Sequence, residues 1–187
     1  MPASSRLPAL ALRDVGIASS VIGLWWLGAS LSAGSGPLAD LLGVTLGLAL
    51  GALGFMLHEW SHLAGAVLGG SRIEFATRLR TKYLFSFDSK HNSRRQFLTM
   101  SAGGFVGTGL SVLAAYTLLP DAELASRVAR GTVLFLAFLG LVLEIPLVLR
   151  GAFGKSLPSI ETFPGHRKRA AQAAEASALP LQEEPAR

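Results

Sequence analysis

The segment from Leu41 to Leu57 contains no charged side chain, and two histidines and a glutamate follow it at once. An apolar stretch of about 20 residues is long enough to cross a lipid bilayer as a helix. Only 16% of the residues in the chain are charged and 50% are hydrophobic, whereas soluble domains carry about 25% charged residues. The sequence therefore predicts a membrane protein with ionisable groups at membrane depth.

Four apolar stretches carry the expected helices, and they cover about residues 15–33, 38–68, 97–119 and 131–149. Glycines recur in the second stretch at three- or four-residue intervals, which favours close packing against another helix. The first stretch has a second interpretation as a secretory signal peptide, because Arg13 precedes it and small residues lie near its end. It is longer than the roughly 7–15 apolar residues of a signal peptide. We therefore favour a retained span and a membrane α-helical bundle of four spans.

The segment between the second and third stretches, about residues 71–95, has a different pattern. Polar and apolar residues alternate over residues 72–80 and aromatic residues dominate 83–87, which favours two short strands in a hairpin or small sheet. This segment contains seven Lys and Arg residues but only two acidic residues. We therefore expect it to be cytoplasmic. Four spans then leave both termini in the cytoplasm. We expect one integral domain over residues 1–160, in a cytoplasmic membrane of the prokaryotic type, and a mobile tail over residues 161–187.

The uncharged run ends in the motif His58-Glu59-Trp60-Ser61-His62. On a helix, His58 and His62 lie one turn apart on the same face, so two imidazoles can bind one metal ion. Glu59 is placed to take a proton from water rather than to bind the metal. Zinc suits imidazole ligands and activates water near neutral pH. The alternative is a pair of hydrogen-bonded helix histidines, but ionisable groups are costly in apolar surroundings, which favours a zinc site.

A catalytic zinc ion usually takes three protein ligands, and two histidines with one carboxylate are a known set. Glu144 in the fourth stretch lies roughly 9 Å from the predicted cytoplasmic surface, against roughly 12 Å for His62, at 1.5 Å per helical residue. We therefore predict Glu144 as the third ligand, close to Pro146, which interrupts the helix hydrogen bonds. Two alternatives stay open: a protonated glutamate hydrogen-bonded between helices, or a ligand from Asp88 or His91 in the basic segment.

These features together resemble the site-2 protease family of intramembrane zinc metalloproteases, over about residues 38–155. The resemblance rests on the His58-Glu59-Trp60-Ser61-His62 motif in a span, on the strand-rich insert, and on the small residues that open the third span. It implies that His58 and His62 bind zinc and that Glu59 is the catalytic base. The family usually supplies its third ligand from a Leu-Asp-Gly segment. This chain has Leu143-Glu144-Ile145-Pro146 at the comparable place.

Two classes of function follow. The first is a zinc endopeptidase that hydrolyses a peptide bond within or near a transmembrane segment of a membrane protein substrate. The second is a catalytically inactive, metal-binding or partner-binding membrane scaffold of the same fold, and the two differ in whether Glu59 is needed once metal is bound. The absence of cysteine excludes disulfides, thiolate metal sites and cysteine nucleophiles. The basic residues cluster beside apolar stretches, which indicates membrane topology rather than nucleic-acid binding.

Overall fold

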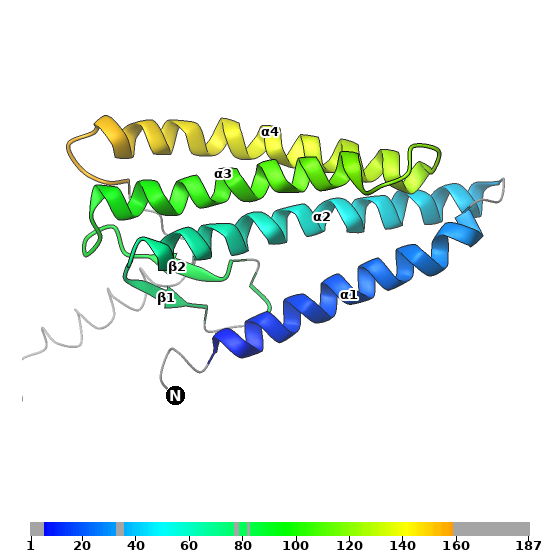
Figure 1. Cartoon of the computed structure of the whole chain (residues 1–187), viewed down its shortest axis with the longest axis horizontal. Coiled ribbons are helices and arrows are strands. Elements are labelled where there is room, and N and C mark those ends of the chain that lie inside the picture. The colour runs from blue at the N-terminus through cyan, green and yellow to red at the C-terminus, as the bar shows by residue number, and fades with distance from the viewer. Residues whose placement is uncertain (1–5, 33–35, 77–78, 82, 159–187) are drawn as a thin grey trace, which may run out of the picture.

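Four long helices dominate the computed structural model of the chain, which describes residues 6–32, 36–76, 79–81 and 83–158 (Figure 1). In chain order the elements are α1 (Leu7–Ser32), α2 (Pro37–Leu68), β1 (Ile73–Phe75), β2 (Phe85–Phe87), α3 (Arg94–Thr117) and α4 (Leu124–Phe153). Each of the four helices is long and apolar enough to cross a membrane. The prediction of four helices with a small sheet between the second and third is confirmed. The tail expected over residues 161–187 lies outside the described residues.

Two of the helices begin about two turns earlier than the apolar stretches predicted. α1 begins at Leu7 instead of about residue 15, and α4 begins at Leu124 instead of about residue 131. The additional turns carry charged residues, among them Arg13, Asp14 and Arg130. Hydropathy locates the apolar centre of a spanning helix, but a helix can continue through charged residues at its ends.

α2 is the central helix, since it contacts the other three helices, and α3 also contacts α4. Glycine makes the contact with α4 close: a Cβ on Gly51 would lie 2.4 Å from the Cβ of Thr132, and a Cβ on Gly47 would lie 2.5 Å from the carbonyl oxygen of Ala125. No larger residue fits at these distances without moving one of the helices. The glycines that recur along the second stretch thus let the backbones of α2 and α4 approach each other closely.

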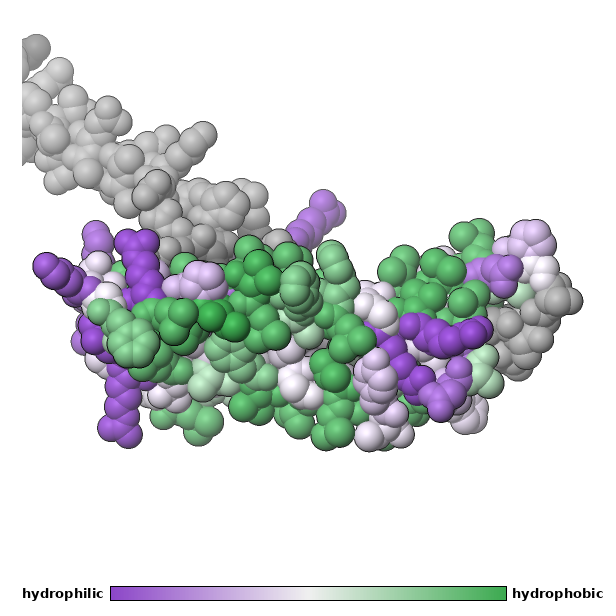
Figure 2. All heavy atoms as spheres, turned by 90° about the horizontal axis from the view of Figure 1, so that it is seen from above, coloured by the Kyte–Doolittle hydropathy of each residue, from purple (hydrophilic) through white to green (hydrophobic). Residues whose placement is uncertain are grey.

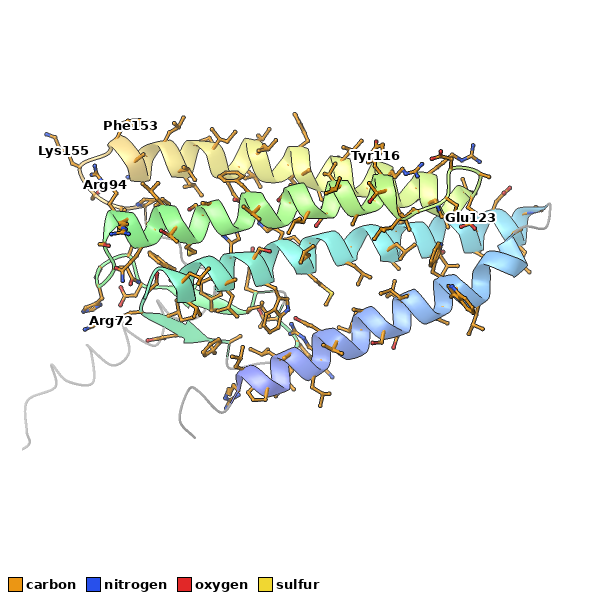
Figure 3. All side chains as sticks on the ribbon, in the orientation of Figure 1. Arg72, Arg94, Tyr116, Glu123, Phe153 and Lys155 are labelled. Carbon is orange, nitrogen blue, oxygen red and sulfur yellow. The ribbon has the colours of Figure 1, made fainter. Side chains whose placement is uncertain are left out.

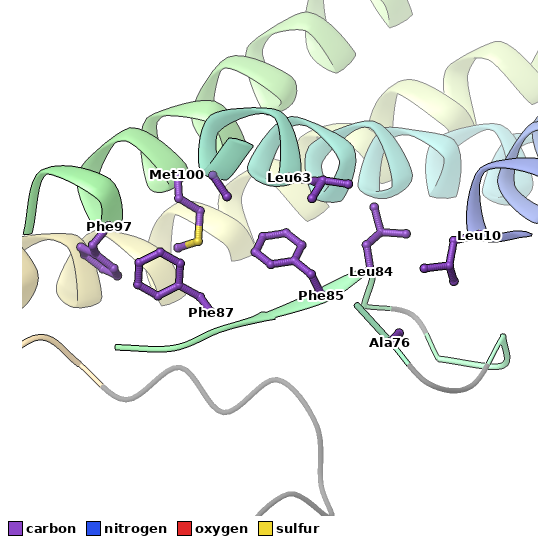
Figure 4. Close-up of a cluster of buried hydrophobic side chains, with 9 residues drawn as sticks. Leu10, Leu63, Ala76, Leu84, Phe85, Phe87, Phe97 and Met100 are labelled. Atoms are coloured by element: carbon purple, nitrogen blue, oxygen red, sulfur yellow. The ribbon is translucent and has the colours of Figure 1, made fainter. Parts of the chain in front are cut away.

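The two strands form an antiparallel hairpin that packs on one end of the helices (Figure 1). Phe85 and Phe87 of β2 are buried in an apolar cluster with Leu10 of α1, Leu63 of α2 and Phe97 of α3 (Figure 4). This cluster is the main hydrophobic core among the described residues, and it holds α1, α2, α3 and the hairpin together at one end of the bundle.

Hydrophilic residues gather toward the two ends of the molecule, and the stretch between them is largely hydrophobic on the face shown in Figure 2. Arg72, Arg94 and Lys155 lie at the hairpin end, and Glu123 lies at the opposite end (Figure 3). Large apolar side chains between the ends point outward, and Phe138 of α4 is 65% exposed. Exposed apolar surface of this extent marks contact with another protein or with lipid.

Candidate metal centre

His58 and His62 lie one turn apart on α2 and direct their rings to the same point, with their Nε2 atoms 3.1 Å apart. Glu144 reaches this point from α4: its Oε1 lies 2.9 Å from the Nε2 of His58, and its Oε2 lies 3.5 Å from the Nε2 of His62. All three side chains are largely buried. Within the described residues, they are the group of ligand side chains close enough together to hold one metal ion.

The two rival ligands lie apart from this group and contact each other. His91 donates a hydrogen bond of 2.5 Å from its Nδ1 to the Oδ2 of Asp88, and both side chains are exposed. This hydrogen bond holds the pKa of Asp88 below its usual range. The described structure therefore favours Glu144 over Asp88 and His91 as the partner of the two motif histidines.

Atoms of α3 hold both histidine rings in place. The Nδ1 of His58 lies 2.8 Å from the hydroxyl oxygen of Thr108 and 3.1 Å from the carbonyl oxygen of Gly104, and the Nδ1 of His62 lies 2.9 Å from the carbonyl oxygen of Met100. A carbonyl oxygen can only accept a hydrogen bond, so the proton of each neutral ring belongs on Nδ1. The Nε2 atoms are then left with lone pairs, which is the arrangement that metal-binding histidines normally show.

Three acceptor groups therefore converge with no hydrogen-bond donor among them. The Nε2 lone pairs of His58 and His62 face each other and the carboxylate of Glu144. The Oε2 of Glu144 is buried and has no hydrogen-bond partner among the described residues. Buried polar atoms are normally satisfied. A cation at this point, either a metal ion or an added proton, is what relieves the repulsion.

The close approach of α3 to these rings depends on glycine. A Cβ on Gly104 would lie 2.2 Å from the Cε1 and 2.3 Å from the Nε2 of His62. The small residues that open α3 predicted a close helix contact, but not that a histidine ring occupies the space beside Gly104. Thr108 was missed as well. Its position one turn after Gly104, on the same face of the helix, is the signal that could have identified it.

A cavity of about 540 Å³ contains the group, and most of its lining is apolar. It lies between α2, α3 and α4, and the aromatic side chains of Tyr83, Phe85 and Phe87 line it on the hairpin side. Glu59 lines the same cavity as the three candidate ligands. An acid–base group, a candidate metal site and a largely apolar space are thus brought together in one place.

The spacing of the candidate ligands suits a small tetrahedral metal ion. Zinc bonds of about 2.0–2.1 Å to nitrogen and oxygen place neighbouring ligands of a tetrahedral site about 3.3 Å apart. The separations here are 2.9, 3.1 and 3.5 Å, which lie on both sides of that value. Two imidazoles and one carboxylate are also a ligand set of catalytic zinc sites, so the residues fit zinc.

No family model, no curated protein and no solved structure matches this chain. A fold alone does not define a function. The chemistry of His58, Glu59, His62 and Glu144, together with the cavity that they line, therefore carries the functional argument.

Proposed function

We propose that the protein is a zinc-dependent endopeptidase embedded in a membrane, which hydrolyses a peptide bond within or near a transmembrane segment of a protein substrate. One observation carries the proposal. The two histidines of an H-E-x-x-H motif converge with a carboxylate from another helix on one cavity, and the glutamate of the motif lines that cavity too. A metal-ligand group with a base beside it is the arrangement that hydrolytic zinc sites require.

The surface of the bundle supports a membrane location. Four helices have the length and composition of spanning helices, and their outward side chains include Leu12, Trp26, Phe135 and Phe138, each more than 60% exposed. Water does not favour such a surface, whereas lipid does. The basic residues of the segment 71–95 support a cytoplasmic position for that end of the bundle.

The mechanism assigns separate roles to the ligands and to the base. His58, His62 and Glu144 would hold the zinc ion, which when bound polarises the scissile carbonyl and promotes attack by water near neutral pH. Glu59 accepts the proton that the attacking water loses. It then passes this proton to the amine nitrogen as the carbon–nitrogen bond breaks. The products are a carboxylate that contains the oxygen of water and a free amine.

The substrate has to be extended where it is cut, because a helix shields its amide groups with its own hydrogen bonds and side chains. A strand of the hairpin can pair with such a segment through backbone hydrogen bonds. Phe85 and Phe87 of β2 line the cavity that holds the candidate ligands, so a segment bound at this strand would lie near Glu59.

The resemblance to site-2 proteases supports the same function with one change of ligand. Glu144 takes the role that an aspartate has in the family. Glutamate is longer by one methylene group, so α4 can lie slightly farther from the metal and still supply a carboxylate oxygen. The separations between Glu144 and the two histidines agree with this substitution.

The test is to measure zinc content and peptide cleavage on the purified full-length protein. The parent should carry about one zinc per chain, and His58→Ala should lose most of it, because two protein ligands hold zinc poorly. Glu59→Gln should keep the zinc and lose cleavage by about 10²–10⁴-fold, since it removes a general base and not a ligand. Glu74→Gln makes the same chemical change on β1, away from the cavity, and serves as the matched control.

Two results would contradict this proposal. Undiminished cleavage by a verified Glu59→Gln protein rules out the assigned base and with it the protease mechanism. A parent protein that holds zinc but cleaves no transmembrane peptide would instead be a metal-binding scaffold of the same fold.

A further inference from the structure

A buried polar cluster links α1 to the back of the motif helix. Asp14 of α1 is only 6% exposed. Its Oδ1 accepts a hydrogen bond of 2.6 Å from the Nε of Arg13, and its Oδ2 accepts one of 2.8 Å from the indole Nε1 of Trp60. Trp60 stands two residues after His58, about 200° around the helix. Asp14 therefore contacts the face of α2 that is turned away from the candidate metal ligands.

The same cluster reaches the hairpin. The Nη1 of Arg13 donates to the carbonyl oxygens of Leu79 and Thr81, at 2.6 and 2.9 Å. The hydroxyl of Thr81 in turn accepts a hydrogen bond of 3.2 Å from the backbone N–H of Tyr83. Tyr83 lines the cavity. Hydrogen bonds thus lead from Trp60, within the motif, through Asp14 and Arg13 to the backbone of Thr81, and the hydroxyl of Thr81 contacts Tyr83 at the wall of the cavity.

The side chains next to this pair on α1 face outward. Leu12 and Val15, on either side of the pair, are 75% and 62% exposed. Leu10 of α1 enters the core cluster (Figure 4), and Leu7 packs against it. Charged groups in an apolar helix are costly unless they are paired, and they usually mark a function. Arg13 and Asp14 are paired both with each other and with two other parts of the chain.

We propose that Arg13 and Asp14 are positioning residues, which tie the backbone at Leu79 and Thr81, ahead of β2, to Trp60 of the motif helix and so set how closely the aromatic wall of β2 covers the cavity. This inference rests on the proposed function where substrate is concerned. The pair does not touch the candidate ligands. It acts through Trp60 on α2 and through the carbonyl groups of Leu79 and Thr81 on the hairpin, so it controls access to the site rather than the chemistry.

The experiment compares Arg13→Gln with Arg130→Gln. Arg130 is a matched control at the opposite end of the bundle, since it too binds two carbonyl oxygens, those of Ala115 and Leu119, and one aspartate, Asp121. Amide hydrogen exchange of the zinc-loaded proteins gives a readout that needs no activity. The N–H of Ala76, which donates to the carbonyl oxygen of Leu84 at 2.9 Å, reports whether the hairpin stays closed.

Arg13→Gln should speed amide hydrogen exchange at Ala76 by about tenfold or more. The zinc content, and the exchange of backbone N–H groups at the α2–α4 interface, should stay as in the parent. Arg130→Gln should leave exchange at Ala76 unchanged. With a transmembrane peptide as substrate, Arg13→Gln should change KM by severalfold with little change in kcat, and Arg13→Lys, which keeps a donor, should recover part of that change. If Arg13→Gln does not fold, Asp14→Asn is the second test variant, because it removes the carboxylate that pairs with Arg13 and should also speed exchange at Ala76.

Unchanged exchange at Ala76 in Arg13→Gln would overturn the proposal. Faster exchange spread evenly over all helices would overturn it too, because Arg13 would then only stabilise the fold. If the parent protein cleaves no peptide, the proposed protease function fails. The exchange measurement still decides whether the Arg13–Asp14 pair holds the hairpin.

Discussion

The surface pair of His91 and Asp88 and the buried group of His58, His62 and Glu144 both join imidazole to carboxylate at hydrogen-bonding distance. They differ in what surrounds them. Asp88 and His91 are 42% and 60% exposed, and their other contacts come from the same turn of chain, such as the bond from the backbone N–H of Lys90 to Asp88. The buried group draws its side chains from two helices and its orientation from a third.

This difference identifies what makes common residue types a candidate metal centre. At the surface, the histidine donates to the carboxylate, and the pair is satisfied by itself. In the bundle, the carbonyl groups of α3 take the Nδ1 protons, so that His58, His62 and Glu144 present acceptors to one another and need a cation. The supporting groups behind the ligands, rather than the ligand types alone, distinguish the two sites.

The largest effect should come from Glu144→Gln, with Asp88→Asn as its counterpart at the surface. Glutamine keeps the size of the side chain but removes the anionic ligand, so zinc affinity should fall by about 100-fold or more. This loss exceeds the roughly 10–100-fold that is typical when a group hydrogen-bonded to a ligand is removed. Asp88→Asn should leave zinc affinity unchanged. Competition with a zinc chelator measures both. Tight zinc binding by Glu144→Gln would make Glu144 a structural residue and would remove the distinction between the two sites.

Gly104→Ala tests the contact that orients His62. The added methyl group would overlap the imidazole ring, so either the ring or α3 must move, and we expect a loss of about 1–3 kcal/mol in stability together with weaker zinc binding. Gly109→Ala in the same helix has open space around the new Cβ. It should stabilise the helix by about 0.5–1 kcal/mol, because alanine loses less backbone entropy than glycine. Thermal unfolding measures the change in stability of each variant, which should be a loss for Gly104→Ala and a gain for Gly109→Ala. A stabilised Gly104→Ala protein would disprove the packing argument.

Thr108→Val should have a smaller effect, confined to the metal. Valine has nearly the same shape as threonine but cannot accept the proton of His58 Nδ1, which then keeps only the longer bond to the carbonyl oxygen of Gly104. Loss of such a supporting hydrogen bond typically weakens metal binding by about 10–100-fold. Because the carbonyl oxygen of Gly104 still accepts a hydrogen bond from His58, we expect a loss near the lower end, about tenfold. Thr108→Ser keeps the hydroxyl and should bind zinc like the parent. Equal affinity of the valine and serine variants would show that Thr108 does not orient the ring.

The parts of the fold and of the site that could be predicted are those with a local pattern. Long uncharged stretches identified the four helices, alternation identified the hairpin, and the spacing of His58 and His62 identified one helical face. The place of Glu144 beside the two histidines was predicted less directly, from its estimated depth in an apolar stretch. In each case neighbouring residues along the chain carry the information.

The supporting groups could not be predicted because they depend on how helices pack. The carbonyl group of Met100 lies against His62, and Asp14 lies against Trp60, 46 positions apart in the chain. Neither contact produces a periodic pattern in the sequence. The starts of α1 and α4 were placed too late for a related reason: their first turns carry charges that tertiary contacts accommodate, such as those of Arg13 with the hairpin.

The smallest effect should come from His91→Ala. In the folded protein the hydrogen bond from His91 keeps the pKa of Asp88 below its usual range. A lowered folded-state pKa means that the pair adds stability above the unfolded pKa of aspartate, and that this contribution is lost as the pH falls through the folded-state pKa. His91→Ala should therefore raise the pKa of Asp88 toward its ordinary value and reduce the small change in stability that occurs below about pH 4. The bond from the backbone N–H of Lys90 persists, so part of the shift should remain.

An NMR titration of the Asp88 side-chain carboxyl carbon measures this shift in the parent and in His91→Ala. Zinc content should be the same in both proteins, because the surface pair lies outside the group formed by His58, His62 and Glu144. A His91→Ala protein that loses zinc would mean that the surface histidine takes part in metal binding. The contrast between a self-satisfied surface pair and a supported buried group would then have to be abandoned.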